Sequence, residues 1–257
     1  MGGALLRGML KSGAAAPGDV WVYDHHQDNV EALQAEYPGV HAAATEEEAA
    51  GTVDTLILAV KPYGILPLIA RLSERAERLP LLVSVATAVT VKDMEACAGE
   101  EARVIRAMPN TPCMVLAGVI AYCCGGEVAA ADEETARLLL AGCGRVLKVD
   151  EAQMNAVSAI SGCGPAYMFT ALDALADAGV AMGLNRRTAL ELAAGTMQGA
   201  ALMVERTGEH PMSLRDAVTS PGGTTIAALN ALDACGFRHA WIQAVKSAVR
   251  RAEEMEG

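Results

Sequence analysis

The 257-residue sequence lacks the patterns that mark metal sites, membrane spans and nucleic-acid surfaces. Its five histidines form no H-E-x-x-H motif and no His/Cys cluster, which argues against a metal site. No stretch approaches the roughly 18 apolar residues of a membrane span, and the N-terminus has no signal-peptide pattern. The net charge of −11 repels nucleic acid and anionic membranes, and no Lys/Arg stripe offsets it. We therefore expect no metal, no nucleic acid and no membrane partner.

Cysteines lack a pattern and aromatic residues are scarce. The seven cysteines show no C-x-x-C spacing, which is typical of reduced, mostly buried thiols in a cytoplasmic protein. Aromatic residues make up only 4 % of the chain, whereas apolar residues as a whole make up 52 %. Because most of these are Ala, Val, Leu and Met, the composition favours closely packed helices over a β-sandwich.

The first half of the chain alternates short β-branched runs with helical patterns. Strands are expected at Val20–Tyr23, Thr55–Val60, Leu81–Val85, Val104–Met108, Val119–Cys123 and Val146–Val149, and helices at Val30–Glu36, Ile65–Ala76 and Asp132–Ala141. Apolar strands that alternate with helices predict βαβ units and a mainly parallel sheet covered on both faces.

After about residue 150 only helical periodicity remains. Helices are expected over Ala152–Ala181, Arg187–Thr207, Leu214–Thr219, Thr225–Ala234 and Phe237–Glu256. Asn185 is the expected N-cap of the second of these, and Gly183 the expected stop of the first. The sequence thus predicts an α/β domain over residues 1–150 and an all-helical domain over residues 151–257. Parts of the helical domain are apolar all round, which favours a subunit interface over the alternative of a self-contained bundle.

The chain opens with a helical pattern that no strand precedes. A dinucleotide-binding unit needs a strand, a Gly-rich turn and a helix whose N-terminal amides hold the pyrophosphate. Gly2 or Gly3 fits the last glycine of such a turn. Asp24, about 20 residues further on, would accept hydrogen bonds from ribose hydroxyls, with a solvated loop acid as the alternative. We therefore expect a Rossmann-like doubly wound sheet whose first strand is missing from the sequence.

Longer motifs carry a resemblance to a known family. They are Val104–Pro112 (VIRAMPNTP), Ser158–Tyr167 (SAISGCGPAY) and Ser220–Thr225 (SPGGTT), with Ala59–Pro62 (AVKP) and Gly208–Pro211 (GEHP) as shorter matches. In this order and spacing the chain resembles pyrroline-5-carboxylate reductase, which makes proline from its cyclic imine precursor. The resemblance covers essentially the whole chain, and the motifs are specific jointly rather than singly.

The sequence departs from the family pattern at a few positions. Met1 aligns with the methionine of the family's G-x-G-x-M, so roughly a dozen residues with two of the three phosphate-loop glycines are expected to be absent. Cys163 stands where the family usually has Ser, and Asn155 replaces a frequent Asp. Thr87-Ala88 replaces an Ala-Gly pair after the third expected strand.

The resemblance implies an α/β fold: a Rossmann-like domain followed by an all-α dimerisation domain. It implies NADPH or NADH as the cofactor and hydride transfer to the C=N bond of 1-pyrroline-5-carboxylate, giving L-proline. It also implies a homo-oligomer through the helical domain, a dimer that in the family extends to a decamer of dimers. The cofactor-binding residues expected on these grounds are Gly2, Asp24, Ala59, Val60, Lys61, Pro62, Ala86, Met108, Pro109 and Asn110.

The loop Ser220–Thr225 carries the expected substrate site. Pro221 fixes φ, the two glycines permit an unusual backbone path, and exposed amides at the following helix start suit a carboxylate. A simple turn with a helix cap is the alternative. By resemblance, Thr225 is the catalytic hydrogen-bond partner of the imine nitrogen. The residues expected to bind substrate are Ser220, Gly222, Gly223, Thr224 and Thr225.

Other interpretations remain for single residues and for the whole chain. Lys61 faces either a cofactor phosphate or solvent, and Cys163 is expected to be a packing thiol. A β-hydroxyacid dehydrogenase would need a Lys on a helix of the second domain, but no Lys occurs between Asp150 and Leu214. A catalytically silent, oligomerising homologue with an incomplete nucleotide site is the remaining alternative. The sequence does not decide between NADH and NADPH.

Overall fold

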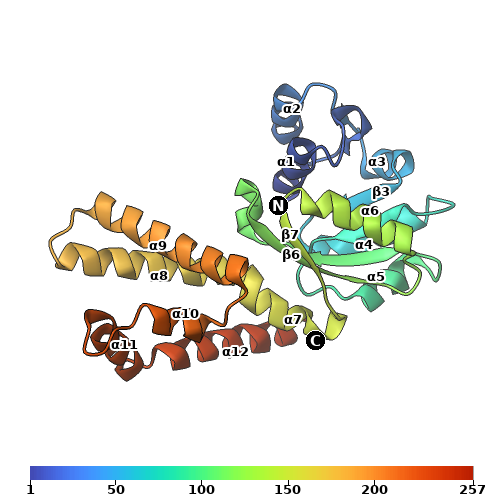
Figure 1. Ribbon diagram of the computed structural model, residues 1–257. Helices are drawn as coiled ribbons and strands as arrows, with labels where there is room; N and C mark the ends of the chain where they lie inside the picture. The colour runs from blue at the N-terminus through green and yellow to red at the C-terminus, as the bar shows by residue number, and fades with distance from the viewer. Residues whose placement is uncertain (257) are drawn as a thin grey trace. The chain divides into compact units, whose positions relative to one another are not determined.

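The computed structural model describes residues 1–256 and divides into two compact units (Figure 1). The first unit comprises Met1–Cys163 together with the C-terminal part of helix α12 from Ala248 onward. The second unit comprises Gly164–Ser247. No helix in the described part of the chain is both long and apolar enough to cross a membrane.

The first unit alternates strands and helices, as the sequence predicts. Its strands are β1 (Trp21–Val22), β2 (His41–Ala42), β3 (Thr55–Leu58), β4 (Leu81–Ser84), β5 (Val104–Met108), β6 (Gly118–Cys124) and β7 (Gly144–Lys148). Its helices are α1 (Gly2–Ser12), α2 (Gln27–Glu36), α3 (Glu46–Thr52), α4 (Pro62–Ser73), α5 (Val91–Ala98), α6 (Ala130–Ala141) and α7 (Met154–Val157). Each expected strand is present; β5 has the expected ends, and the others are shifted by one or a few residues.

A five-stranded sheet in the order β3-β4-β5-β6-β7 forms the centre of this unit. Strands β3, β4 and β5 are parallel, β6 is antiparallel to β5, and β7 is parallel to β6. The mainly parallel sheet is confirmed, but the reversal at β6 was not predicted. Only residues 109–117 link β5 to β6, fewer than the dozen or so that a parallel crossover needs. This short link contains the 3-10 helix η2 (Thr111–Val115) and returns the chain directly as an antiparallel neighbour.

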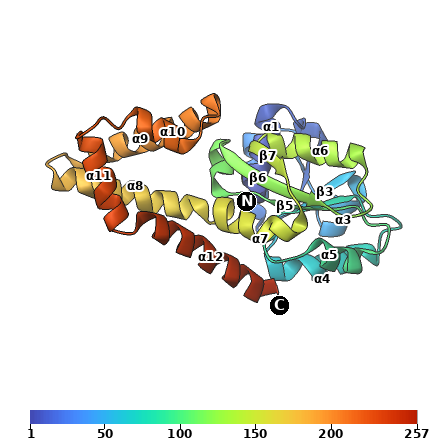
Figure 2. The same ribbon diagram turned by 60° about the horizontal axis from the view of Figure 1, so that its bottom comes forward.

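Helices cover both faces of this sheet. Leu82 of β4 packs in one apolar cluster with α4 and α5, including Met94. Its neighbour Val83 packs in a second cluster with Leu5 of α1 and Leu140 of α6. Figure 2 shows the sheet between α6 on one side and α4 and α5 on the other. Because both faces are covered, β4 and β5 are buried along their whole length and are mostly apolar rather than alternating.

Strands β1 and β2 form a separate parallel pair. Among the described residues, β1 pairs only with β2, and β3 pairs only with β4. In a doubly wound sheet of order 3-2-1-4-5-6 the first strand lies between the second and the fourth. Here β1 and β3 correspond to those two strands, and no strand pairs with both of them among the described residues.

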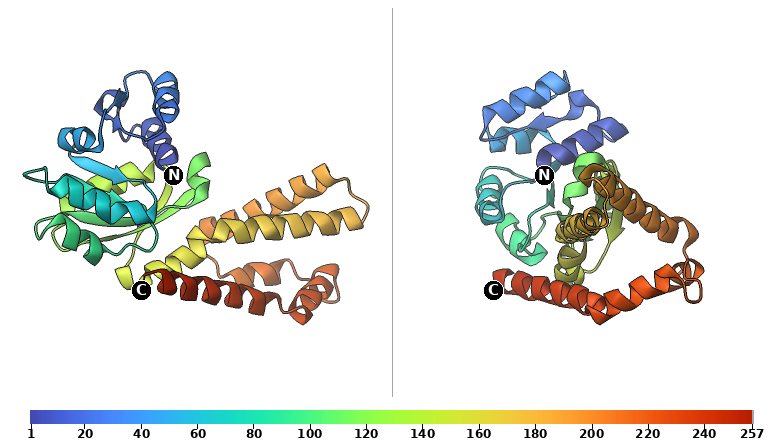
Figure 3. Two further views of the ribbon diagram at one scale, coloured as in Figure 1. Left: turned by 180° about the vertical axis from the view of Figure 1, so that it is seen from behind. Right: turned by 90° about the vertical axis from the view of Figure 1, so that its left-hand side faces the viewer.

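The second unit is helical. It contains α8 (Gly164–Ala181), α9 (Arg186–Thr207), α10 (Pro211–Ala217), α11 (Thr224–Ala234) and most of α12 (Phe237–Glu256). Figure 3 shows α8 and α9 side by side as an antiparallel hairpin. Gly183 adopts a φ of +98° after α8, and the Asn185 side chain accepts a hydrogen bond from the Thr188 amide at 3.0 Å. The predicted stop and N-cap are therefore confirmed.

The single long helix expected over Ala152–Ala181 is wrong. The chain instead forms the 3-10 turn η3 (Glu151–Gln153), the short α7, and a π-helical turn η4 (Ser158–Gly162) before α8 begins. Gly162, Gly164 and Pro165 explain the break, because glycine weakens a helix and proline cannot donate the usual i→i−4 hydrogen bond. The helix expected over Leu214–Thr219 also begins earlier, since Pro211 fits the first helical position.

Candidate active site

The segments that follow β3, β4 and β5 lie along one edge of the first unit's sheet. Leu58 is paired in register with Ser84, and Ser84 with Arg106. Because the strands are parallel, the segments Ala59–Pro62, Val85–Ala86 and Met108–Asn110 all emerge at the carboxyl edge. Open α/β sheets bind ligands at this edge. Expected cofactor residues from three separate parts of the sequence thus lie along the same edge.

Helix α1 begins at the same edge. A Cβ atom added to Gly2 would lie 3.0 Å from the Cβ of Ala59, so the start of α1 touches the end of β3. No side chain caps the first amides of α1 in the described structure. A helix N-terminus with uncapped amides attracts phosphate groups. Gly2 therefore has both the position and the small size that close approach to a pyrophosphate requires.

Lys61 and Pro62 open helix α4. Lys61 is the N-cap residue and Pro62 the first helical residue, where the missing N–H of proline costs no helical bond. The Lys61 carbonyl accepts a hydrogen bond from the Gly64 amide at 2.8 Å. The Lys61 side chain is exposed. This arrangement places a cation at the carboxyl edge and is compatible with either expected role of Lys61.

Asp24 follows β1 and is fixed by its own loop. Its carboxylate accepts hydrogen bonds from the His26 amide at 2.8 Å and from the Asn29 side-chain nitrogen at 3.0 Å. Burial raises the pKa of Asp24, but the hydrogen bonds from His26 and Asn29 outweigh this, so its pKa is lowered. Asp24 is thus an exposed, oriented carboxylate that stays charged at neutral pH.

The loop after β4 contains buried Ala86 and a strained neighbour. The Ala86 amide donates to the Ser84 hydroxyl at 3.4 Å. Ala88 adopts a φ of +58°, in the left-handed region that side chains with a Cβ disfavour. This is one of the positions at which the family pattern is expected to have glycine. The loop therefore keeps a glycine-type backbone path with an alanine in it.

Asn110 is held by two backbone groups of the protein. Its side-chain nitrogen donates to the Ser161 carbonyl at 2.9 Å, and its side-chain oxygen accepts from the Val119 amide at 3.0 Å. The residue is only 7 % exposed. The sequence predicts that Asn110 binds the cofactor, but it does not predict the hydrogen bonds to Ser161 and Val119.

The sequence also did not predict an ion pair between a buried arginine and a partly exposed glutamate near this edge. Arg106 of β5 is 2 % exposed, and its Nη1 lies 3.3 Å from Oε1 of Glu151. The same Glu151 oxygen accepts a hydrogen bond from the Val91 amide at 2.6 Å, at the start of α5. A buried arginine needs a hydrogen-bonded acid. The charged residue inside the apolar run Val104–Met108 was the available signal, although it does not name its partner.

The expected substrate loop lies in the second unit, between α10 and α11. The Gly223 amide donates to the Ser220 carbonyl at 3.1 Å, which closes a four-residue turn with Pro221 second and Gly222 third. Gly222 has a φ of +69°, as glycine at that turn position allows. A Cβ on Gly223 would lie 2.4 Å from the Ser220 hydroxyl oxygen. The backbone therefore favours glycine at position 222, whereas Gly223 has an ordinary φ of −78° and its small size makes room for the Ser220 hydroxyl.

This turn leads directly into α11. Gly223 is the N-cap residue, and no side chain caps the helix among the described residues. The amides of Thr224 and Thr225 thus open the helix, with Thr224 exposed and Thr225 half-buried. The turn can hold an anion at the helix start, and a hydroxyl lies beside it.

The expected cofactor residues and the expected substrate residues fall in different units. All of the former lie in the first unit, and all of the latter lie in the second. In the first unit they lie at the carboxyl edge of the five-stranded sheet, except Asp24, which follows strand β1 of the separate pair, and in the second unit they lie at the start of α11. No group of three or more potential metal-ligating side chains occurs among the residues that the structure describes.

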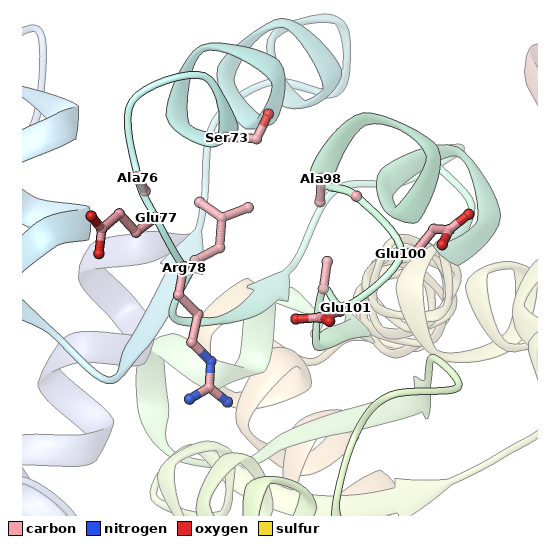
Figure 4. Close-up of a pocket in the computed structure, with 10 residues that line it drawn as sticks. Ser73, Ala76, Glu77, Arg78, Ala98, Glu100 and Glu101 are labelled. Carbon is pink, nitrogen blue, oxygen red and sulfur yellow. The ribbon is translucent and has the colours of Figure 1, made fainter.

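A pocket of about 270 Å³ lies elsewhere in the first unit (Figure 4). It is bounded by the ends of α4 and α5 and by residues that precede β4 and β5, including Leu79 and Ala102. Glu77, Arg78 and Glu101 border it. It therefore lies at the amino ends of these strands, opposite to the edge where open α/β sheets bind ligands. None of the expected site residues lines it.

The second unit leaves much apolar surface uncovered. Exposed side chains on α8 and α9 include Phe169, Leu175, Leu192 and Met203. The buried residues of these two helices are Gly164, Ala176, Ala189 and Ala193, which are all small. An apolar surface of this kind is typical of an interface with another chain.

Comparisons with known proteins agree with this arrangement. Residues 151–255 match the family model described as pyrroline-5-carboxylate reductase dimerisation. Residues 1–88 match the model described as NADP oxidoreductase coenzyme F420-dependent. The dimerisation match begins at residue 151, just after β7, where alternating strands and helices give way to helices alone.

Relatives match over nearly the whole chain. Pyrroline-5-carboxylate reductase of Arabidopsis thaliana is 38 % identical over 255 residues, covering 99 % of this chain and 92 % of its own. The Escherichia coli enzyme is 36 % identical, covering 99 % and 94 %.

Solved structures of the same enzyme share the fold. The structure from Coxiella burnetii superposes with a TM-score of 0.92 at 33 % identity, covering 99 % of this chain and 94 % of that one. The Plasmodium falciparum structure, which has NADP bound, gives 0.89 at 28 %, covering 100 % and 95 %. Both the Rossmann-like sheet and the helical part are included in these superpositions. This chain therefore belongs to the pyrroline-5-carboxylate reductase family.

Proposed function

We propose that this protein reduces the C=N bond of 1-pyrroline-5-carboxylate with NADPH or NADH and so produces L-proline. The observation that carries the proposal is the relationship to the Arabidopsis and E. coli reductases over 99 % of the chain. The gathering of the expected cofactor segments at the carboxyl edge of the sheet supports it, because this is where open α/β sheets bind nucleotides.

The carboxyl edge fits a dinucleotide. Gly2 at the uncapped start of α1 would hold the pyrophosphate, where a larger residue would collide with Ala59. The Asp24 carboxylate would accept hydrogen bonds from the ribose hydroxyls. The segments Ala59–Pro62 and Ala86 would flank the ribose and phosphates, and Met108–Asn110 would meet the nicotinamide end. When bound, the reduced nicotinamide supplies the hydride.

The turn before α11 fits the carboxylate of the substrate. Ser220, Gly222, Gly223 and Thr224 would surround that carboxylate, using the first amides of α11 and the Ser220 hydroxyl. The Thr225 hydroxyl would accept a hydrogen bond from the N–H of the protonated imine and orient it. A protonated imine is already electrophilic, so the chain needs no strong general base at this position. The task of the protein is then to align the reacting carbon and to keep water away.

We further propose a homo-oligomer formed through residues 151–257, with residues 1–150 as the cofactor domain. The exposed apolar side chains of α8 and α9 and the dimerisation-model match support a dimer. A decamer built from such dimers is proposed from the resemblance alone. We propose the cytoplasm as its location, supported by seven cysteines that are all free.

One observation favours a second candidate function. The β1–β2 pair is not hydrogen-bonded to the main sheet in the described structure. The alternative that this favours is an oligomerising homologue with an incomplete nucleotide site. Absorbance at 340 nm with the imine and either cofactor distinguishes the two, with chromatographic detection of proline as the second readout. No oxidation of cofactor and no proline would support the silent homologue.

Paired threonine variants test the substrate loop. Thr225→Val keeps the shape and the helix start but removes the hydroxyl, so kcat/KM for the imine should fall roughly ten- to a hundredfold, as for a hydrogen bond to a charged group. Thr224→Val is the matched control and should lose less, because Thr224 acts through its backbone amide. Cofactor affinity should change little in both. If Thr224→Val lowers kcat/KM strongly while Thr225→Val matches wild type, the hydroxyl at the imine nitrogen belongs to Thr224 and the assignment to Thr225 is wrong.

A further inference from the structure

We infer that Asn110 is a positioning residue for the reduction, which joins the nicotinamide-end segment to the π-helical turn Ser158–Gly162. The effect on catalysis rests on the proposed function. The two hydrogen bonds from which it follows stand on their own. They connect two of the longer sequence motifs, which lie 51 residues apart at the bonded atoms.

The need for a donor begins with Pro165. In an α-helix the Ser161 carbonyl would accept a hydrogen bond from the amide of residue 165, and proline has no amide hydrogen. The chain responds with a π-helical turn, in which the Cys163 amide donates to the Ser158 carbonyl at 2.8 Å. The Ser161 carbonyl is met by the Asn110 side-chain nitrogen at 2.9 Å. Asn110 thus replaces the donor that Pro165 cannot supply.

The oxygen of the Asn110 side-chain amide is bonded to the segment that links β5 to β6. The Asn110 side-chain oxygen accepts from the Val119 amide at 3.0 Å, and the Asn110 carbonyl accepts from the Cys113 amide at 3.1 Å. A backbone amide only donates and a carbonyl only accepts, so these partners fix which way the side chain faces. Aspartate could not donate to Ser161, and serine has no second polar group.

The hydrogen bonds of the Asn110 side chain lie between the expected nicotinamide segment and the end of the first unit. Asn110 directly follows Met108 and Pro109, which we assign to the nicotinamide end. Ser161 lies in the last turn of the first unit, directly before Gly164 begins the second. One buried side chain therefore fixes the cofactor segment and the point at which the chain leaves the first unit. Because both ends of the amide are already bonded, its loss should affect the chemical step more than cofactor binding.

Asn110→Asp tests this with nearly unchanged shape. The new carboxylate still accepts from the Val119 amide but repels the Ser161 carbonyl. At neutral pH we expect kcat to fall about tenfold or more, while the dissociation constant of NADPH changes less than about twofold. When protonated, the carboxyl group can donate to Ser161, and burial raises its pKa. The kcat of this variant should therefore recover toward acidic pH relative to wild type.

A double-mutant cycle with Pro165→Ala is the second measurement. This change returns an amide donor to the Ser161 carbonyl, so Asn110→Ala should lower kcat at least about threefold less in the Pro165→Ala background than in wild type. The cycle is measured on both kcat and the melting temperature, which keeps it informative if Asn110→Ala is unstable.

Three results would overturn the inference. They are equal effects of Asn110→Ala in both backgrounds, a large rise in the NADPH dissociation constant with unchanged kcat, and an Asn110→Asp variant that loses only melting temperature without acid recovery. An inactive wild type would instead overturn the proposed function, and the coupling in melting temperature would still decide whether Asn110 serves Ser161.

Discussion

Ala88 lies between β4 and α5 in a left-handed conformation, with a φ of +58°. A residue with a Cβ in this conformation costs about 1–2 kcal/mol relative to the right-handed region. Glycine removes that cost, and it suits the position where the family pattern is expected to have it. Ala88→Gly should therefore stabilise the first unit.

The expected size of the stabilisation by Ala88→Gly follows from two opposing effects. Glycine loses about 0.5–1 kcal/mol more backbone entropy on folding than alanine does, which offsets part of the relief. The methyl group of Ala88 is only half-buried, so its removal leaves no large cavity. The net gain is about 0.5–1 kcal/mol in the free energy of unfolding. For a chain of this size that corresponds to a melting temperature higher by roughly 1–4 °C.

Thermal unfolding followed by circular dichroism measures this change. The matched control is Thr87→Gly, one position earlier in the same exposed loop, where φ is not positive. There glycine brings only the entropy cost, so the melting temperature should fall slightly. If both variants shift the melting temperature in the same direction, the left-handed conformation of Ala88 is not the source of the effect.

Three further outcomes are expected. Glu151→Ala should lower the melting temperature by several degrees, because it removes an acid from Arg106 and from the Val91 amide, while Glu151→Gln should cost less since it still accepts from that amide. If the two variants lower the melting temperature equally, the hydrogen bond from the Val91 amide does not contribute to stability. Asp24→Ser should raise the NADPH/NADH ratio of kcat/KM about tenfold, because a 2′-phosphate no longer meets a carboxylate. The lowered pKa of Asp24 keeps that carboxylate charged at neutral pH, where the ratio is measured, and a strong wild-type preference for NADPH would contradict this. A version with an added upstream strand and G-x-G turn should bind dinucleotide much more tightly in a calorimetric titration, and equal affinity would show that the place between β1 and β3 is not needed.

Much of the fold could be predicted because its elements have local signals. The runs at β3, β4 and β5 are apolar and β-branched, and Asn185 and Gly183 are typical helix-end residues. Helix α3 was missed because its first turn is Glu46–Glu48 and it buries only Ala49 and Ala50, so it has no wide apolar stripe. The capping signal was present, since Thr45 accepts from the Glu48 amide at 3.1 Å.

The site residues that belong to short sequence motifs could be predicted, whereas contacts between residues far apart in the sequence could not. The segments after β3, β4 and β5 reach the same edge because parallel strands must end together. Ser161 lies 51 residues from Asn110 along the chain, and Glu151 lies 45 residues from Arg106. Nothing in a local pattern specifies such pairs. Pro165 was the nearest clue to the first pair, because a proline inside a helix leaves a carbonyl that needs a donor.

The small size of the residues buried in α8 and α9 has a consequence for how the protein behaves on dilution. Ala176, Ala189 and Ala193 allow close helix contact but remove little apolar area from water. We therefore expect much of the stabilisation of the helical unit to come from association, which follows mass action. Its melting temperature should fall with each tenfold dilution, whereas that of the first unit should stay constant. Loss of activity at low enzyme concentration would then begin in the helices rather than at the nucleotide site.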